Sequence, residues 1–229
     1  MANQPLGALI TLLSCTTRLT PAQIATLSSI PVQVIPAPGA GKMIVPLFVF
    51  LNYEFGTVQY YAVSDSLNLT LDSGSVSVIA TPFADLITDN PASALFFAPT
   101  GLPLGDASVA AVVDTALLIQ SAADYPASGI GAVSIAAQGS GYALGDTGTV
   151  TTGNGDASYE ITGVGALGVV TSFKITYAGT GYSVGNDQAT ATGGAQPGVG
   201  TLFAIDVTSL AAGDGTLKVV VCYQILDVS

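Results

Sequence analysis

The chain of 229 residues contains no histidine and no tryptophan, and only 8% of its residues are charged. Histidine is the commonest general base and the commonest metal ligand in proteins, so Asp, Glu, Cys and Tyr are left to carry any chemistry. Ser-His-Asp and Cys-His nucleophile arrangements are excluded. We therefore expect a protein that is not an enzyme, with no catalytic residues, no cofactor and no metal.

Positive charge is also scarce. The only cations are Arg18, Lys42, Lys174 and Lys218, against 15 acidic residues, which gives a formal net charge of −11. Such a chain has no basic surface to neutralise phosphates, and it is repelled by nucleic acids and by anionic membranes. The sequence thus predicts no nucleic-acid partner and no membrane partner.

Apolar residues make up 49% of the chain, which is far from the composition of disordered proteins. The chain should fold. Interspersed charge normally keeps the surfaces of soluble monomers apart, and this chain has little of it. We expect much of its surface to be covered by copies of itself or by partner proteins.

The N-terminal region is apolar. Residues 6–15 (LGALITLLSC) lack a preceding Lys or Arg and are too few to span a bilayer, so we expect residues 1–19 to form an extended arm or a first strand. Cys15 and Cys222 lie near opposite ends of the chain. Two cysteines in a chain of this length are no disulfide framework, and we expect two buried thiols in a reducing compartment.

Glycine and proline are unevenly distributed. Residues 129–206 hold 18 of the 27 glycines but only Pro197 of the 12 prolines. This shift in composition predicts that residues 129–206 are an inserted module; the resemblance described below leads us to expect that it projects as a knob. The last apolar segment resembles the first part of the chain, so residues 20–128 plus 207–229 are predicted to form one discontinuous body.

An internal repeat lies within the glycine-rich block. Gly139-Ser-Gly141-Tyr142 matches Gly179-Thr-Gly181-Tyr182 at an offset of 40 residues, and downstream residues match at an offset of 44. Two repeats are few for a solenoid, so we expect a small closed or paired β module.

Alternating apolar residues between glycine turns predict an all-β protein, with a jelly-roll or β-sandwich body. In the module, strands are expected at residues 132–137, 148–152, 158–163, 170–177, 188–192 and 202–207. In the body, strands are expected at residues 32–35, 43–53, 58–63, 67–71, 75–79, 95–98, 111–119 and 217–226. A short helix should start after Thr20, with a capping box to Gln23, and end near Ser28. A second helical turn is expected near residues 82–87.

Three motifs invite a functional interpretation. Residues 38–42 (PGAGK) fail the context test for a phosphate-binding loop and fit a turn before a strand. Tyr142 and Tyr182 are either aromatic platforms for a ligand or, as we favour, rings that cap the core of their own repeat. Residues Asp146, Asn154 and Asp156 are either Ca²⁺ ligands or, as we favour, turn residues that bind their own backbone.

Residues 19–24 (LTPAQI), 29–42 (SIPVQVIPAPGAGK) and 213–223 (GDGTLKVVVCY) together resemble capsid decoration, or cement, proteins of tailed bacteriophages. The Gly-Ser-Gly-Tyr module resembles glycine-rich repeats inserted in various phage head and tail proteins. The resemblance covers the body moderately and the insertion loosely.

This resemblance implies a jelly-roll-like body, often a homotrimer, that sits on the outer capsid surface of a virion made in the host cytoplasm. Such a protein bridges major capsid proteins and stabilises the shell. The alternative is a tail-fibre or receptor-binding component whose module recognises a glycan on the host surface. A Ca²⁺-dependent depolymerase is a third hypothesis, and it lacks the cluster of carboxylates that it would need.

Overall fold

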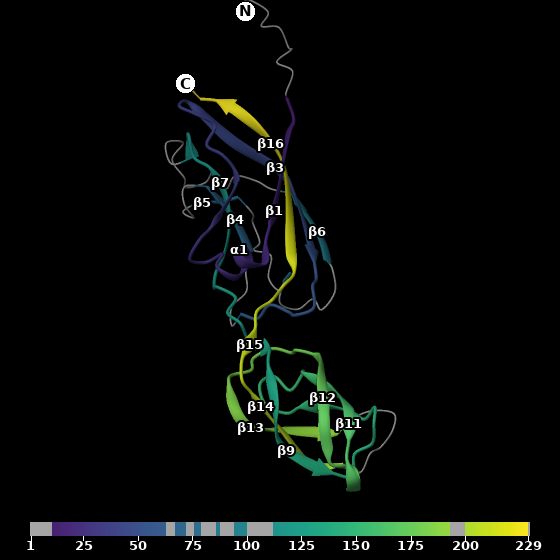
Figure 1. The fold of residues 1–229 in the computed structure, drawn as a ribbon. Helices are drawn as coiled ribbons and strands as arrows, with labels where there is room; N and C mark the ends of the chain where they lie inside the picture. Colours follow the sequence, from purple (N-terminus) through teal and green to yellow (C-terminus); the bar gives the residue numbers. More distant parts are fainter. Residues whose placement is uncertain are drawn as a thin grey trace, which may run out of the picture.

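The computed structural model describes residues 11–62, 67–71, 76–78, 86–87, 94–99, 112–192 and 200–228. The protein is all-β, as its sequence predicts, and its antiparallel strands form two lobes joined at β15 (Figure 1). Each lobe has its own cluster of buried apolar side chains. The larger lobe, the body, is a β-sandwich, and the smaller lobe is the repeat module.

The first body sheet has the strand order β1-β16-β3-β6. Its strands are β1 (Leu13–Leu19), β16 (Thr216–Asp227), β3 (Lys42–Glu54) and β6 (Ala94–Pro99). The long strand β16 comes after the module in the chain, yet it pairs with β3 along its whole length, from Thr216 to Asp227. The first body sheet is therefore complete only when the segments before and after the module are both present.

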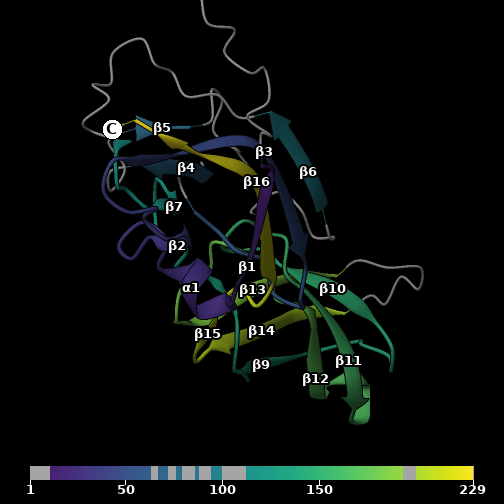
Figure 2. The same ribbon diagram turned by 90° about the horizontal axis from the view of Figure 1, so that it is seen from above.

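The second body sheet has the strand order β2-β7-β4-β5. Its strands are β2 (Val32–Ile35), β7 (Leu117–Ser121), β4 (Leu67–Leu71) and β5 (Val76–Ser77). Figure 2 shows β4 and β7 on one side of the body, and β3, β16 and β6 on the other. Leu51 and Val219 from the first sheet and Leu69 and Ile119 from the second are fully buried in one core. Their burial holds the two sheets together.

Helix α1 (Pro21–Ala25) starts where the sequence predicts, although it ends before Ser28. The Gln23 amide donates to Thr20 Oγ1, and the Thr20 amide donates to Gln23 Oε1, so the predicted capping box is confirmed. Ile24 is fully buried and anchors the helix to the body core. Residues 13–19 form β1, an edge strand of the first sheet, so of the two expectations for this region the first strand is confirmed there; residues 1–10 of the expected arm lie outside the described residues.

The module is built on a six-stranded sheet with the order β12-β11-β10-β13-β14-β9. Its strands are β9 (Val133–Ser140), β10 (Thr147–Val150), β11 (Ser158–Val164), β12 (Val170–Tyr177), β13 (Gly185–Thr192) and β14 (Thr201–Val207). All six strands predicted for the module are confirmed, with ends shifted by up to three residues. A 3₁₀ turn, η2 (Ala166–Gly168), joins the two repeats.

The two repeats exchange strands. The first repeat comprises β9, β10 and β11, and the second comprises β12, β13 and β14. Read from either end, the sheet runs through equivalent strands in the same order, and the two middle strands β10 and β13 pair at its centre. Strand β9 pairs only with β14 of the second repeat, and β12 pairs only with β11 of the first. Neither repeat can therefore complete its own sheet.

Two body strands differ from the expectation. Residues 58–62 are irregular, because the Val58 amide donates to Asp214 and the Tyr60 ring packs inward, so these residues form a loop and not a strand. Strand β7 begins at Leu117, later than predicted, because Asp114 has a left-handed backbone (φ 54°) that interrupts an extended chain. Of the helical turn expected at 82–87, residues 82–85 lie outside the described residues, and residues 86–87 form a turn.

A short two-stranded ribbon joins the lobes. It pairs β8 (Gly129–Ile130) with β15 (Leu210–Ala211). Beside it, Tyr177 Oη in the module donates a hydrogen bond of 2.5 Å to Gln59 Oε1 in the body. The module is thus attached by paired strands and by a side-chain contact, which makes the attachment firmer than a single linker.

Candidate assembly face

The outer side of the first body sheet carries apolar side chains. Its register places Phe48 beside Cys222 and Phe50 beside Val220, while the alternate residues of β3 point into the core. Phe48 and Phe50 are exposed at 42% and 38%. Large aromatic side chains on an exposed sheet face are typical of surfaces that bind other proteins. We call this surface the assembly face; it comprises Ser14, Thr16, Arg18, Phe48, Phe50, Lys218, Val220 and Cys222.

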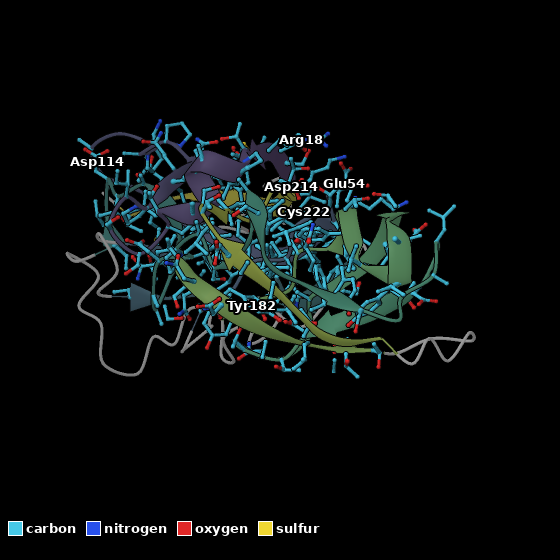
Figure 3. All side chains as sticks on the ribbon, turned by 60° about the horizontal axis from the view of Figure 1, so that its bottom comes forward. Arg18, Glu54, Asp114, Tyr182, Asp214 and Cys222 are labelled. Carbon is cyan, nitrogen blue, oxygen red and sulfur yellow. The ribbon has the colours of Figure 1, made fainter. Side chains whose placement is uncertain are left out.

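Two of the four cations of the chain lie on the assembly face. Arg18 and Lys218 stand directly opposite each other on β1 and β16. Arg18 Nη2 forms an ion pair with Glu54 Oε2 and donates to Thr216 Oγ1 at 3.0 Å. Figure 3 shows Arg18 and Glu54 close together. Lys218 has no ion pair among the described residues. The exposed Arg18–Glu54 pair is expected to add little stability.

The two cysteines lie on adjacent strands but on opposite sides of the sheet. Cys15 points inward, and its thiol donates to the Val34 carbonyl oxygen at 3.1 Å. Cys222 lies in register with Ser14 on the assembly face. Both are free thiols, as expected, but both are only half-buried, so the expectation of two buried cysteines is wrong. The cause is their position in the sheet: Cys222 faces outward, and Cys15 lies on the edge strand β1.

Strand β1 forms one edge of this sheet. An edge strand offers unpaired backbone groups to an additional strand, and proteins normally protect such edges with charge, proline or a covering loop. On β1 the only charged side chain is Arg18. Within the part of the chain that the structure describes, the assembly face and the β1 edge together offer an adjoining apolar surface and a strand edge with no further strand paired to it.

The two repeat tyrosines are buried and offer no platform to a ligand. Tyr142 is 6% exposed and Tyr182 is 5% exposed. Tyr182 Oη accepts a hydrogen bond from the Ala157 amide at 2.9 Å and donates to the Val150 carbonyl at 3.1 Å. The core-capping interpretation is therefore confirmed, with one correction.

The correction concerns which repeat each tyrosine caps. Tyr182 belongs to the second repeat but binds the hairpin between β10 and β11 of the first. Tyr142 belongs to the first repeat, and its ring packs edge-on against Phe203 of the second at 5.8 Å. Each ring thus caps the core of the other repeat, because the strands of the two repeats are exchanged.

The acidic turn residues of the module bind backbone and hydroxyl groups. Asp146 Oδ2 accepts from the Ala143 amide at 2.8 Å, and Asp156 Oδ1 accepts from the Thr180 amide at 3.0 Å. Asn154 Nδ2 donates to Thr180 Oγ1 at 2.9 Å. Among the described residues no group of three or more His, Cys, Asp or Glu side chains could hold a metal ion. The prediction that these residues bind their own turn is therefore confirmed for Asp146, whereas Asp156 and Asn154 of the first repeat bind Thr180 of the second.

The glycine-rich segment at residues 38–42 is a turn that leads into a strand, as predicted. Gly39 and Gly41 have positive φ angles of 99° and 73°, and the Lys42 amide donates to the Gly39 carbonyl at 3.1 Å. Strand β3 begins at Lys42, where a phosphate-binding loop would lead into a helix.

Asp214 is a structural residue that the sequence did not single out. Its Oδ1 accepts from the Thr57 and Val58 amides at 2.7 and 2.8 Å, and its Oδ2 accepts from the Thr57 hydroxyl at 2.7 Å. Partial burial raises the pKa of Asp214, but the hydrogen bonds from Thr57 and Val58 outweigh burial and lower it below the ordinary value. Asp214 thereby fastens the loop at residues 55–62 to the segment that returns from the module.

We expect Asp214→Asn to destabilise the body by about 1–2 kcal/mol at pH 7, because charge-assisted hydrogen bonds are lost. A carboxyl whose pKa is lowered by folding stabilises the protein above its unfolded pKa, about 3.9, and this contribution is lost as the pH falls through its folded pKa. The difference between wild type and variant should therefore shrink in acid. Urea unfolding at pH 7 and pH 3 measures it.

Asp187→Asn is a matched control for this experiment, because the Asp187 carboxylate is exposed and accepts no hydrogen bond among the described residues. An Asp214→Asn variant as stable as the wild type at pH 7, or a difference that grows in acid, would show that Asp214 does not fasten the loop.

No helix among the described residues is long and apolar enough to cross a membrane. Comparisons of the chain with protein-family models, with curated proteins and with solved structures found no match. The functional conclusion therefore depends on the surfaces of the molecule.

Proposed function

We propose that this chain is a non-enzymatic virion structural protein that decorates and stabilises a phage capsid by bridging major capsid proteins. The observation that carries the proposal is the assembly face, where Phe48 and Phe50 are exposed beside the cations Arg18 and Lys218. The proposal includes a homotrimer on the outer capsid surface, as the resemblance to cement proteins implies.

The chemistry of the assembly face supports a protein partner. Its apolar rows can be desolvated without burying charge, and Lys218 at their end, which has no ion pair among the described residues, can pair with an acidic group of the partner. The remainder of the chain is strongly acidic, so the face is the part of the described surface least opposed to an acidic partner. Lattices of repeated subunits present the same patch many times, which suits a protein with one such face.

The alternative, a tail-fibre or receptor-binding component that recognises a glycan, has less support. Aromatic platforms are the usual sugar-binding surface. Tyr142 and Tyr182, which the alternative needs for this purpose, lie in the module core. What favours the alternative is the separation of the module from the body, which leaves the distal end of the module accessible (Figure 1).

The copy number in purified particles tests the proposal. Quantitative mass spectrometry should give a number of copies comparable with that of the major capsid protein. A few copies per particle would instead indicate a tail component and would overturn the proposal.

The double variant Phe48→Asp/Phe50→Asp tests the assembly face itself. We expect its affinity for shells that lack this protein to fall about hundredfold or more, because two aromatic anchors become charged and acidic. Binding is measured by co-sedimentation with the shells, and thermal unfolding shows whether the variant still folds. Val184→Asp is the control, since Val184 is exposed in the module, away from the assembly face.

Cys222 provides a second readout that leaves the face intact. In a Cys15→Ser variant, Cys222 is the only thiol, and a maleimide should label it in the free protein but much more slowly on the shell. Equal labelling rates in the two states would show that the shell binds another surface.

A further inference from the structure

The end of the module farthest from the body carries exposed aliphatic side chains. Leu144 is 69% exposed, Leu167 is 90% exposed, and Leu202 is 85% exposed. Val164, at the end of β11, is 37% exposed. Three segments meet at this end: residues 139–146, 163–169 and 200–203. We call this end the leucine pole.

Several contacts bring these segments together. The Gly141 amide donates to the Leu167 carbonyl at 3.0 Å, and Ser140 pairs with Thr201 next to Leu202. Gly200 lies against the Tyr142 ring. In Figure 1, β9 and β11 both reach the end of the module opposite β15. The three segments that carry the exposed leucines therefore lie together at the pole, although they are far apart in the sequence.

Two of the leucines are held in a backbone conformation that opposes their side chains. Leu167 and Leu202 have φ angles of 61° and 62°, in the left-handed region that favours glycine and asparagine. Neither side chain recovers this cost by burial in the module, since both are almost fully exposed. A leucine in a strained backbone conformation, with its side chain exposed, is what we expect if that side chain contacts an apolar surface outside the protein.

The backbone at the leucine pole is satisfied internally. The Tyr142 amide donates to the Gly168 carbonyl at 3.0 Å, and the Gly145 amide donates to the Ile161 carbonyl at 2.9 Å. The Gly165 amide donates to the Val169 carbonyl at 2.8 Å. Loops that enter a lipid interface must avoid dehydrating free amide groups, and these loops meet that condition at these positions.

Charge defines the kind of environment. Within the three segments of the pole, Asp146 is the only charged residue, and it is 5% exposed. With a net charge of −11 for the whole chain, the protein is opposed to anionic lipids but not to neutral ones. The sequence-based expectation of no membrane partner rests on that charge, and it applies to anionic surfaces.

The size of the pole favours a bilayer over a protein. A stable protein–protein interface uses roughly 20–30 residues on each side, far more than these four aliphatic side chains. A bilayer accepts individual side chains at the boundary between head groups and acyl chains, so it needs no matching surface. The pole is also the part of the module most distant from the bulk of the molecule, so it can reach a flat surface first.

We propose that the leucine pole is a docking site for a neutral lipid bilayer, into which Leu144, Leu167 and Leu202 insert reversibly. The body stays outside the bilayer and is free to bind its protein partner. The proposal is independent of the function proposed for the assembly face, which lies on the other lobe.

The variant Leu167→Trp tests insertion directly in the full-length chain. The chain contains no tryptophan, so all indole fluorescence comes from the pole. With phosphatidylcholine vesicles we expect the emission to move to shorter wavelength and the protein to float with the vesicles. Unchanged emission and no flotation would overturn the proposal, and so would binding only to vesicles that contain phosphatidylglycerol.

The variant Leu167→Asn/Leu202→Asn tests which side chains are responsible. Asparagine tolerates a left-handed backbone, so the module should remain folded, as thermal unfolding will show. We expect vesicle binding to fall about tenfold or more, because two aliphatic groups no longer leave water. Val184→Asn, at the equivalent position to Leu144 in the second repeat, is the matched control and should bind as wild type. Equal binding by the double variant and wild type would overturn the proposal.

Discussion

Replacing Gly148 with valine is expected to unfold the repeat module and to leave the body folded. Gly148 lies on β10 at the centre of the module sheet, and a Cβ atom there would collide with the Ala191 carbonyl oxygen and with the Tyr159 ring and hydroxyl. Neither the neighbouring backbone nor the fully buried Tyr159 can move aside, so the free energy of unfolding of the module should fall by more than about 3 kcal/mol.

Calorimetry and hydrogen exchange should detect this selective effect, because each lobe has a core of its own. We expect the thermal transition of the module to move to a much lower temperature or to disappear. Protection of backbone amides from exchange should be lost in β9–β14 but kept in β3 and β16. Ala189→Val is the control, since Ala189 is exposed on the neighbouring strand β13. A single transition that shifts as a whole would show that the two lobes unfold together.

Replacing Tyr60 with alanine should destabilise the body and leave the repeat module unaffected. Tyr60 is 1% exposed, its ring centroid lies 6.3 Å from that of Tyr53 and 5.7 Å from that of Tyr125, and its hydroxyl donates to the Gly215 carbonyl at 2.8 Å. Removing a buried aromatic ring costs about 3–5 kcal/mol. The melting temperature of the body should fall by about 10 °C, while the module keeps its transition.

Tyr60→Phe separates the contribution of the ring from that of the hydroxyl. It keeps the aromatic cluster and removes only the hydrogen bond to Gly215, so the expected loss is about 1 kcal/mol. If Tyr60→Phe destabilises the body as much as Tyr60→Ala, the ring is not what holds the loop at residues 55–62 against the core.

The local sequence pattern was sufficient to predict the strands of the module and the cap of the helix. Glycine turns separate short alternating segments there, and an alternating segment between turns has few other choices. The capping box of Thr20 and Gln23 depends on neighbouring residues alone, so it could also be recognised without the fold.

Pairing between distant segments could not be predicted in the same way. The alternation of β9 predicts a strand, but nothing in it specifies β14 of the other repeat as its partner. The loop at residues 55–62 has the composition of a strand, but its Thr57 and Val58 amides donate to Asp214, which is more than 150 residues away. Tertiary contacts therefore overrode a local preference.

The assembly face was missed for a related reason. Strand β3 is apolar on both of its faces, so its alternation cannot say whether Phe48 and Phe50 or their neighbours Val49 and Leu51 face the core. Only the packing of the second sheet against Val49 and Leu51 decides this. A strand that is apolar on both faces is nevertheless a signal that the second face is covered by something, and that signal was present in the sequence.

The exchange of strands also restricts how this gene can change. Deleting one repeat of about 40 residues would leave β9 without β14, or β12 without β11, and would remove one of the tyrosines that cap the opposite core. Adding one repeat would create the same imbalance. Recombination between repeated segments readily alters their number in ordinary tandem arrays. Here it would yield an incomplete sheet, so we expect the two repeats to be kept or lost together.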